Sequence, residues 1–312
     1  MQTVLRHRAA VCALAALSLT GAALGQSEQA AVARIEHRIN PDIHATQPTA
    51  GGTGVMTPNI TYHGGAVMAT PTVYIIWYGN WNQSNGSDNP AGQQIVRDFL
   101  FGLNNSPYYL INASYGAPTG GVTFGGETTD TGSVGRRLTD AKIKTIVSNA
   151  IAGGKLPKNA NGLYFVLSSS NVPETSGFCN VYCGWHTSAG ISGTRIKYSF
   201  IGNANRCLSA CAAQTIGPNA NAGVDGMISV IAHELEETNT DPNPTTGWAD
   251  SSGAENGDKC AWTFGSAQTL LPSGAYYNMT LPTSTGGSRN YLVQRNLDAN
   301  SKCYVDYVTK QQ

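Results

Sequence analysis

Six cysteines in the second half of the chain constrain its fold more than any other feature. They are Cys179, Cys183, Cys207, Cys211, Cys260 and Cys303. An even number of cysteines in an exported chain predicts three disulfides. The spacing favours two local pairs, Cys179–Cys183 and Cys207–Cys211, together with Cys260–Cys303. A zinc knuckle is the alternative, but its usual spacing is C-x2-C rather than the C-x3-C seen here.

The N-terminus has the three parts of a secretory signal. A basic stretch, Arg6 to Arg8, precedes an apolar run over 9–24, and small residues occupy positions 23 and 25. This run is shorter than the roughly 20 residues that a membrane-spanning helix needs. We therefore predict a signal peptide over 1–25 and a secreted or extracellular protein. The compartment would be a cell wall or apoplast-like space, or the periplasm in a bacterium.

The charge balance excludes two classes of partner. The chain has 19 basic and 19 acidic residues, and segment 1–25 removes two arginines but no acidic residue. A mature chain that is slightly acidic lacks the basic surface that nucleic acids or anionic membranes attract. We expect no nucleic-acid partner, and no membrane association once the signal is removed.

The remaining chain divides into a linker or pro-region over 26–58, rich in glycine and proline, and one domain over 59–312. Apolar runs predict buried strands over 72–78, 163–168 and 195–202, with shorter strands over 122–124, 291–295 and 304–308. Helical spacing predicts helices over 93–103, 140–151 and 224–237. The alternation indicates an α+β fold, a mixed sheet with flanking helices and disulfide-stapled loops in a zincin-like arrangement. We place the strand over 195–202 at the edge of a cleft, where an extended peptide could add to the sheet.

The helix over 224–237 contains the segment that could support chemistry. Its apolar residues recur at helical spacing, which places His233 and Glu237 on the opposite face, directed into a cleft or solvent. The sequence H-E-x-x-E resembles the H-E-x-x-H helix of zinc peptidases, with glutamate in place of the second histidine. His233 and Glu237 are therefore candidate zinc ligands. Glu234 is the candidate general base that takes a proton from a zinc-bound water.

A third zinc ligand must come from elsewhere in the chain, because a catalytic zinc uses three protein ligands and one open position. Glu255 and Asp250 follow the helix at a suitable distance, and the sequence does not choose between them. His186, shortly after Cys183, is a further candidate, either as a ligand or as a donor to the transition state. Three fixed residues are a weak motif, and a solvated helix face rich in glutamate has the same pattern. Calcium in the loop from Asp241 to Asp258 is the alternative metal, because it prefers oxygen ligands.

Several segments in order resemble the phosphate-induced, EXORDIUM-like family of secreted proteins. They include His63-Gly-Gly, the run from Val73 to Gly79, the stretch from Gln94 to Leu100, and Cys183-Gly-Trp-His186. Two further segments, Gly223 to Met227 and Cys260-Ala-Trp262, continue the resemblance to about residue 303. The resemblance implies an extracellular or cell-wall protein with no settled biochemical activity. The H-E-x-x-E helix would make this chain a zincin-like variant of the family.

Two functions follow from these features. The leading hypothesis is a secreted zinc-dependent hydrolase, a peptidase that acts on an extracellular protein or peptide; whether the chain is an enzyme is left open. The alternative is a non-catalytic extracellular or cell-wall protein of the EXORDIUM-like type, which binds a cell-wall glycan or a protein partner. Exposed tryptophan or tyrosine rings could then stack on sugars, although we expect Trp77, Tyr78, Trp185 and Trp262 to lie in the core.

Overall fold

A computed structural model of the protein describes residues 35–38, 59–117 and 121–307. The predicted signal peptide and most of the predicted linker lie outside these residues. The alternation of strands and helices that the sequence predicts is present, and the fold is α+β with a mixed sheet and disulfides, as predicted. Long, β-branched and aromatic runs form the interior strands of this sheet.

The sheet has six strands in the order β1-β6-β7-β5-β3-β4. Its members are β1 (Ile35–Arg38), β3 (Thr72–Tyr78), β4 (Thr123–Asp130), β5 (Gly162–Ser168), β6 (Tyr182–Ile191) and β7 (Thr194–Gly202). The strands β4, β3, β5 and β7 are parallel, whereas β6 pairs antiparallel with β7, and β1 antiparallel with β6. The strand β7 is therefore interior, so its predicted place at a cleft edge is wrong.

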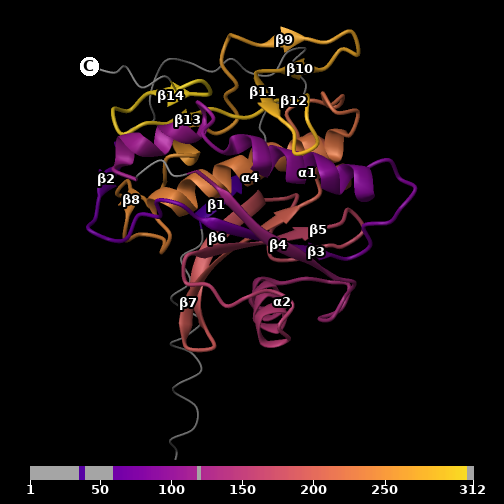
Figure 1. Ribbon diagram of the computed structural model, residues 1–312, viewed down its shortest axis with the longest axis vertical. Coiled ribbons are helices and arrows are strands. Elements are labelled where there is room, and N and C mark those ends of the chain that lie inside the picture. Colours follow the sequence, from indigo (N-terminus) through magenta and orange to yellow (C-terminus); the bar gives the residue numbers. More distant parts are fainter. Residues whose placement is uncertain (1–34, 39–58, 118–120, 308–312) are drawn as a thin grey trace, which may run out of the picture. The chain divides into compact units, whose positions relative to one another are not determined.

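Helices cover both faces of the sheet (Figure 1). The helices α1 (Pro90–Leu103) and α4 (Ala222–Thr240) lie on one face, and α2 (Asp140–Ala152) lies on the other. The short helix α3 (Leu208–Cys211) and the 3-10 turns η1 (Tyr109–Tyr115), η2 (Ala204–Arg206) and η3 (Asp258–Cys260) connect these elements. Trp77, Tyr78 and Trp185 are fully buried, and Trp262 nearly so, as the sequence predicts.

Two-stranded ribbons add a further layer to the protein. They pair β9 (Thr269–Leu270) with β10 (Tyr276–Tyr277), β11 (Met279–Pro282) with β12 (Ser288–Tyr291), β13 (Asn296–Leu297) with β14 (Cys303–Tyr304), and β2 (Thr61–Tyr62) with β8 (Trp248–Ala249). The ribbons from β9 to β14, orange to yellow in Figure 1, lie on the side of α1 and α4 that faces away from the sheet. These two helices are thus enclosed between two layers.

The disulfides join segments that are far apart in the sequence. Cys179 bonds to Cys207, Cys183 to Cys211, and Cys260 to Cys303. The prediction of the third pair is confirmed, but the two predicted local pairs are wrong. Cys183 lies on β6 and Cys179 just before it, and each bonds across to the segment around α3 instead of closing a short loop. These bonds hold the start of β6 against the segment that leads into α4.

Candidate metal centre

The helix α4 is buried on every side. Asn221 caps it by accepting a hydrogen bond from the backbone N–H of Val224, and every residue from Gly223 to Thr240 is buried. The prediction that His233 and Glu237 face an open cleft or solvent is therefore wrong. The strands β6 and β7, the helix α1 and the turn η1 all contact α4, and His186 of β6 lies within 4 Å of both Glu234 and Glu237.

Three side chains from three separate elements meet beside this helix. His186 comes from β6, Glu237 from α4, and Glu255 from the loop that leads into η3. The Nδ1 atom of His186 lies 3.7 Å from Oε2 of Glu237, and its Nε2 atom lies 3.6 Å from Oε2 of Glu255. All three side chains are at most 1% exposed. We call these three residues the first ligand group.

Apart from Oε1 of Glu237, which accepts from the backbone N–H of Asp258, the polar atoms of the first ligand group lack the hydrogen bonds that buried polar atoms normally make. Within the described part of the chain, neither ring nitrogen of His186 and neither carboxylate oxygen of Glu255 has a hydrogen-bond partner. Their separations slightly exceed hydrogen-bond length. One ligand atom from each of the three side chains lies within 4.8 Å of the others, close enough for all three to reach one ion, which the imidazole would bind through a single nitrogen. The arrangement therefore fits a shared cation better than a hydrogen-bond network.

A second ligand group lies beside the first and shares Glu237 with it. Its members are His233, Glu237 and Asp258. The Nε2 atom of His233 lies 2.9 Å from Oε1 of Glu237 and 3.7 Å from Oδ1 of Asp258. The two carboxylate oxygens of Glu237 thus face different histidines. One carboxylate links the two groups into a single cluster.

Gln294 orients the ring of His233, and the sequence analysis did not identify it. Its side-chain amide donates to Nδ1 of His233 at 2.7 Å, which leaves Nε2 directed toward Glu237. In this arrangement a neutral ring carries its proton on Nε2, so the contact orients the ring but is opposite in sense to the N–H donation by which metal-bound histidines are usually held. No metal-binding motif contains this glutamine, so a search for histidine and carboxylate ligands could not have found it.

Burial and mutual repulsion shift the pKa values of the cluster in the directions that favour neutral side chains. Burial, together with the nearby His233, lowers the pKa of His186 to about 3. Burial likewise lowers the pKa of His233 to about 4. Burial and neighbouring carboxylates raise the pKa of Glu255 and Glu237 well above the usual range. Neutral imidazole is the form that binds metals, and a divalent cation would supply the positive charge that the carboxylates lack.

The other predicted site residues take different positions. Glu234 is buried beside the cluster, with Oε2 at 3.6 Å from Nδ1 of His186. Asp250 is not brought to the cluster, because it forms a buried ion pair with Lys259 and accepts hydrogen bonds from Ser252. Burial raises the pKa of Asp250, but the hydrogen bonds from Lys259 and Ser252 outweigh it and bring the pKa down to about 2.

The loop from Asp241 to Asp258 does not form a calcium site made of carboxylates. Asp241 accepts hydrogen bonds from the backbone of Gly247 and from Thr246. Among the described residues, both groups of side chains that could hold a metal contain a histidine. These observations favour a metal with affinity for nitrogen over calcium.

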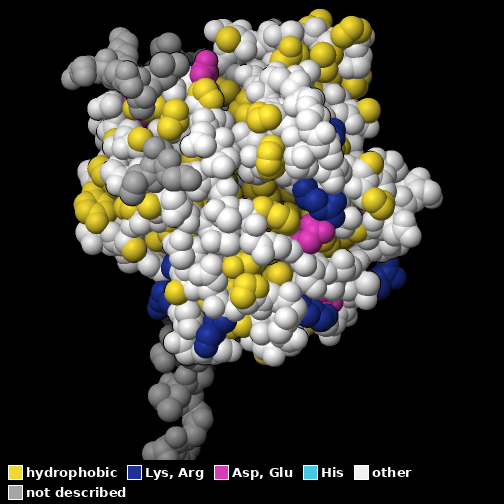
Figure 2. Space-filling view, in the orientation of Figure 1, with side chains coloured by type: hydrophobic (Ala, Val, Ile, Leu, Met, Phe, Trp, Pro, Cys, Tyr) yellow, Lys and Arg dark blue, Asp and Glu magenta, His cyan; other side chains and the backbone are white. Residues whose placement is uncertain are grey.

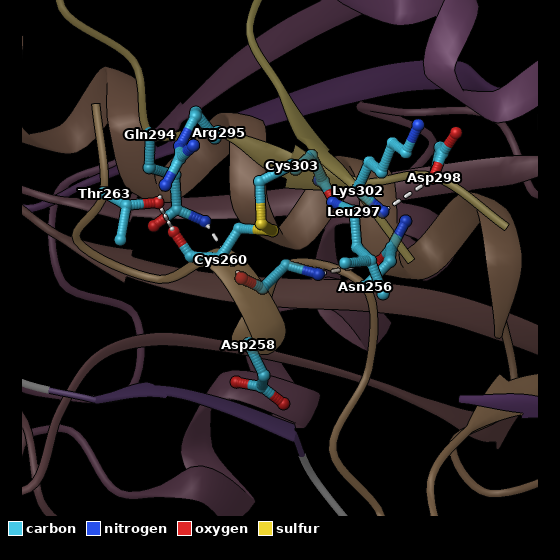
Figure 3. Close-up of a disulfide and its surroundings, with 12 residues drawn as sticks. Asn256, Asp258, Cys260, Thr263, Gln294, Arg295, Leu297, Asp298, Lys302 and Cys303 are labelled. Carbon is cyan, nitrogen blue, oxygen red and sulfur yellow. Dashed lines mark hydrogen bonds between the residues drawn. A yellow bond between two sulfur atoms is a disulfide. The ribbon is translucent and has the colours of Figure 1, made fainter. Parts of the chain in front are cut away.

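The disulfide Cys260–Cys303 fixes the loop that supplies Glu255 and Asp258 (Figure 3). The same loop is tied to β13 by the backbone N–H of Leu297, which donates to the carbonyl of Asn256. In Figure 3 the carboxylate of Asp258 points away from the disulfide. Covalent and hydrogen-bonded attachment to the C-terminal ribbons thus holds these carboxylates against α4.

Comparison with known proteins identifies the family. The conserved region of phosphate-induced protein 1 matches residues 60–303. The chain belongs to the phosphate-induced protein 1 family. It is 30% identical to Protein EXORDIUM-like 3 of Arabidopsis thaliana, a match that covers 75% of this chain and 79% of that protein. Protein EXORDIUM-like 5 of the same plant is 28% identical, over 76% and 74% of the two chains.

Further relatives have the same kind of name. Protein EXORDIUM of Arabidopsis thaliana is 27% identical, over 74% of this chain and 81% of its own length. No solved structure matches the chain. The family resemblance predicted from the sequence is confirmed. That the H-E-x-x-E helix makes this chain a zincin-like variant stays a prediction, as do the roles of the site residues.

The comparisons overturn the leading functional hypothesis. The matching relatives are EXORDIUM-like and phosphate-induced proteins, and none of their names describes a peptidase or another hydrolase. The prediction that the chain is a zinc-dependent peptidase is therefore wrong. The alternative prediction, a non-catalytic extracellular protein of the EXORDIUM-like type, is better supported.

The disulfides bear on the predicted location. Three disulfides in one domain are typical of proteins that fold in an oxidising, extracytoplasmic compartment. In the described part of the chain, no helix combines the length and the apolar character that a bilayer crossing requires.

Proposed function

We propose that this protein is a non-catalytic extracellular protein that binds polysaccharide and whose core is held together by a zinc ion. The burial of the first ligand group supports this proposal most strongly. A catalytic zinc keeps one position open to water and substrate, whereas a structural zinc is enclosed by its ligands. His186, Glu237 and Glu255 are at most 1% exposed, which is the character of a structural site.

The ligand types favour zinc over other divalent ions. Zinc accepts imidazole nitrogen and carboxylate oxygen, whereas calcium and magnesium prefer oxygen alone. The cluster offers nitrogens from His186 and His233 and oxygens from Glu237 and Glu255. These residues come from β6, α4 and the loop before η3, so one ion would join the sheet, the central helix and the C-terminal layer.

An exposed pair of aromatic rings supports polysaccharide as the partner. Tyr62 and Trp248 lie opposite each other on the β2–β8 ribbon, with ring centroids 5.4 Å apart. Tyr62 is 51% exposed, and Trp248 is half-buried against Tyr115. Aromatic rings that line binding sites offer flat apolar faces, against which sugar rings can stack.

The metal proposal is tested by zinc content and thermal stability of the mature protein. We expect about one zinc per chain, lost in His186→Ala but retained in His63→Ala, which replaces an exposed histidine. Because an ion that binds only the folded state stabilises it, a chelator should lower Tm and added zinc should restore it. Equal zinc content in the two variants, or no zinc after zinc is offered, would reject the site.

The binding proposal is tested by retention on insoluble cell-wall polysaccharide. We expect Tyr62→Ala to weaken retention several-fold, because it removes the most exposed ring of the pair. Phe101→Ala is the matched control, since Phe101 is also 51% exposed but lies on α1. Absence of retention for the unaltered protein would reject polysaccharide binding.

A further inference from the structure

A cleft lined by cations lies away from the candidate metal centre. Its walls are Arg136, Arg137, Lys142, Asn171, Pro173 and Arg206, and its volume is about 630 Å³. This is within the range of about 300–1,000 Å³ that is usual for ligand sites. Four of its six lining residues are basic, although the whole chain has as many acidic as basic residues.

The fold places this cleft where parallel sheets commonly bind ligands. The strands β4, β3, β5 and β7 end side by side, with Asp130 opposite Tyr78, Tyr78 opposite Ser168, and Ser168 opposite Gly202. The lining residues follow these ends, in the loops after β4, β5 and β7 and at the start of α2. Crevices outside the carboxyl ends of parallel strands are the usual binding sites of open α/β sheets.

The loops that form the cleft are fixed to one another. The backbone N–H of Leu138 donates to the carbonyl of Pro173, and Thr175 donates back to the carbonyl of Leu138. Arg206 donates through Nη1 to the carbonyl of Ser170, and Lys142 donates to the carbonyl of Arg137. These bonds hold the loops and the side chains of Arg206 and Lys142 in place before any ligand arrives, which lowers the entropy cost of binding.

No acidic residue is among the six that line the cleft. Glu174 is buried and accepts hydrogen bonds from Tyr182 and from the backbone of Ser176 and Phe178. Asp130 accepts from the backbone of Gly132 and Ser133 within its own turn. Neither lines the cleft. In Figure 2 several Lys and Arg side chains also appear around the part of the molecule that α2 forms, with few acidic ones among them.

We propose that this cleft binds an acidic polysaccharide through the carboxylates of its sugar residues. This inference rests on the proposed polysaccharide binding and adds its place and its ligand chemistry. Cations from two loops and a helix, spread around a cleft much larger than one small anion, match a chain of repeated carboxylates. Arginine in particular pairs with a carboxylate through two parallel hydrogen bonds.

The test measures binding of polygalacturonate, of dextran as an uncharged polymer, and of inorganic phosphate as a small anion. We expect the mature protein to bind polygalacturonate, with affinity that falls as salt rises. The triple variant Arg136→Gln, Arg137→Gln, Arg206→Gln should bind about tenfold or more weakly. Each exposed ion pair between an arginine and a sugar carboxylate contributes modestly to affinity, and this variant removes three of them. Since Arg206 also holds a loop, the double variant without Arg206→Gln should show the same direction of change with an unaltered Tm.

The matched control removes three cations outside the cleft, Lys144→Gln, Lys155→Gln and Lys158→Gln, and should change the affinity less than twofold. Equal loss in this control, or unchanged binding in the cleft variants, would overturn the inference while leaving polysaccharide binding intact. Binding of phosphate without polygalacturonate would also overturn it. If the protein binds neither polygalacturonate, nor dextran, nor wall polysaccharide, both the inference and the proposed function are rejected.

Discussion

Gly257 lies against Glu237, which both ligand groups share, and against His233 of the second group. A Cβ atom at this position would come within 2.8 Å of Oε1 of Glu237 and 2.8 Å of Nδ1 of His233. We predict that Gly257→Ala displaces one of them and lowers zinc affinity by about 10- to 100-fold, the usual effect of disturbing the surroundings of a metal ligand. Competition with a chelator measures this affinity. In Gly190→Ala the added Cβ meets nothing within 4 Å, so equal affinities in the two variants would contradict the prediction.

Asp225, near the start of α4, predicts a pH dependence that is separate from the metal centre. It is buried beside Asn219, whose backbone and side-chain amides donate to its oxygens. Burial raises its pKa to about 6, whereas an unfolded chain has an aspartate pKa of about 3.9. Between these values the folded state binds the proton more tightly. Its contribution to stability is therefore full below about pH 4 and falls as the pH rises to 6.

We expect Asp225→Asn to remove this loss, which amounts to roughly 3 kcal/mol. Urea unfolding at several pH values from 4 to 7 measures the difference. Asp98→Asn is the control, because hydrogen bonds from Gln94 and Arg289 outweigh burial and lower the pKa of Asp98. Asp98 therefore stabilises the fold above pH 4, and that contribution is lost as the pH falls below it. An unaltered slope between pH 4 and 6 in Asp225→Asn would refute the assignment.

At the level of elements, the sequence predicts those with a clear period. The strands β3, β5 and β7 and the three long helices appear within a few residues of their predicted bounds. The strand β6 was missed, because its cysteine, glycine, histidine and serine residues give no apolar run, and it supplies His186. The predicted environment of α4 is also wrong, because a helical period indicates which face is buried but not what covers the other face. The sequence predicts Glu255 as a candidate ligand but not its contact with His186, because that contact depends on long-range packing.

The disulfides that hold β6 predict a link between covalent structure and the metal centre. Cys183 is three residues before His186 in the strand, and its bond to Cys211 anchors β6 to α3. We expect Cys183→Ala with Cys211→Ala to lower the free energy of unfolding by about 2–5 kcal/mol, the usual cost of removing a native disulfide. Chemical denaturation measures this change. Zinc content should fall in the same protein, and a double variant with full zinc and unchanged stability would speak against the link.

For the whole molecule, the sheet depends on a strand that lies far from the rest in sequence. The strand β1 pairs with β6 antiparallel, with Ile35 opposite His186. Without β1, the backbone N–H and C=O groups at this edge of β6 would be available to another chain. We predict that a protein beginning at residue 59 dimerises or aggregates, whereas one beginning at residue 33 stays monomeric. Light scattering at matched concentrations distinguishes the two. Identical monomers would show that the edge is protected without β1.

The position of β1 shows that the region shared with relatives and the central sheet have different boundaries. The region shared with relatives spans residues 60–303, whereas the sheet begins at Ile35. A boundary drawn from the shared sequence would therefore separate β1 from β6 and break a hydrogen-bonded ladder. The stretch that identifies the family and the stretch that completes the sheet are thus not the same part of the chain.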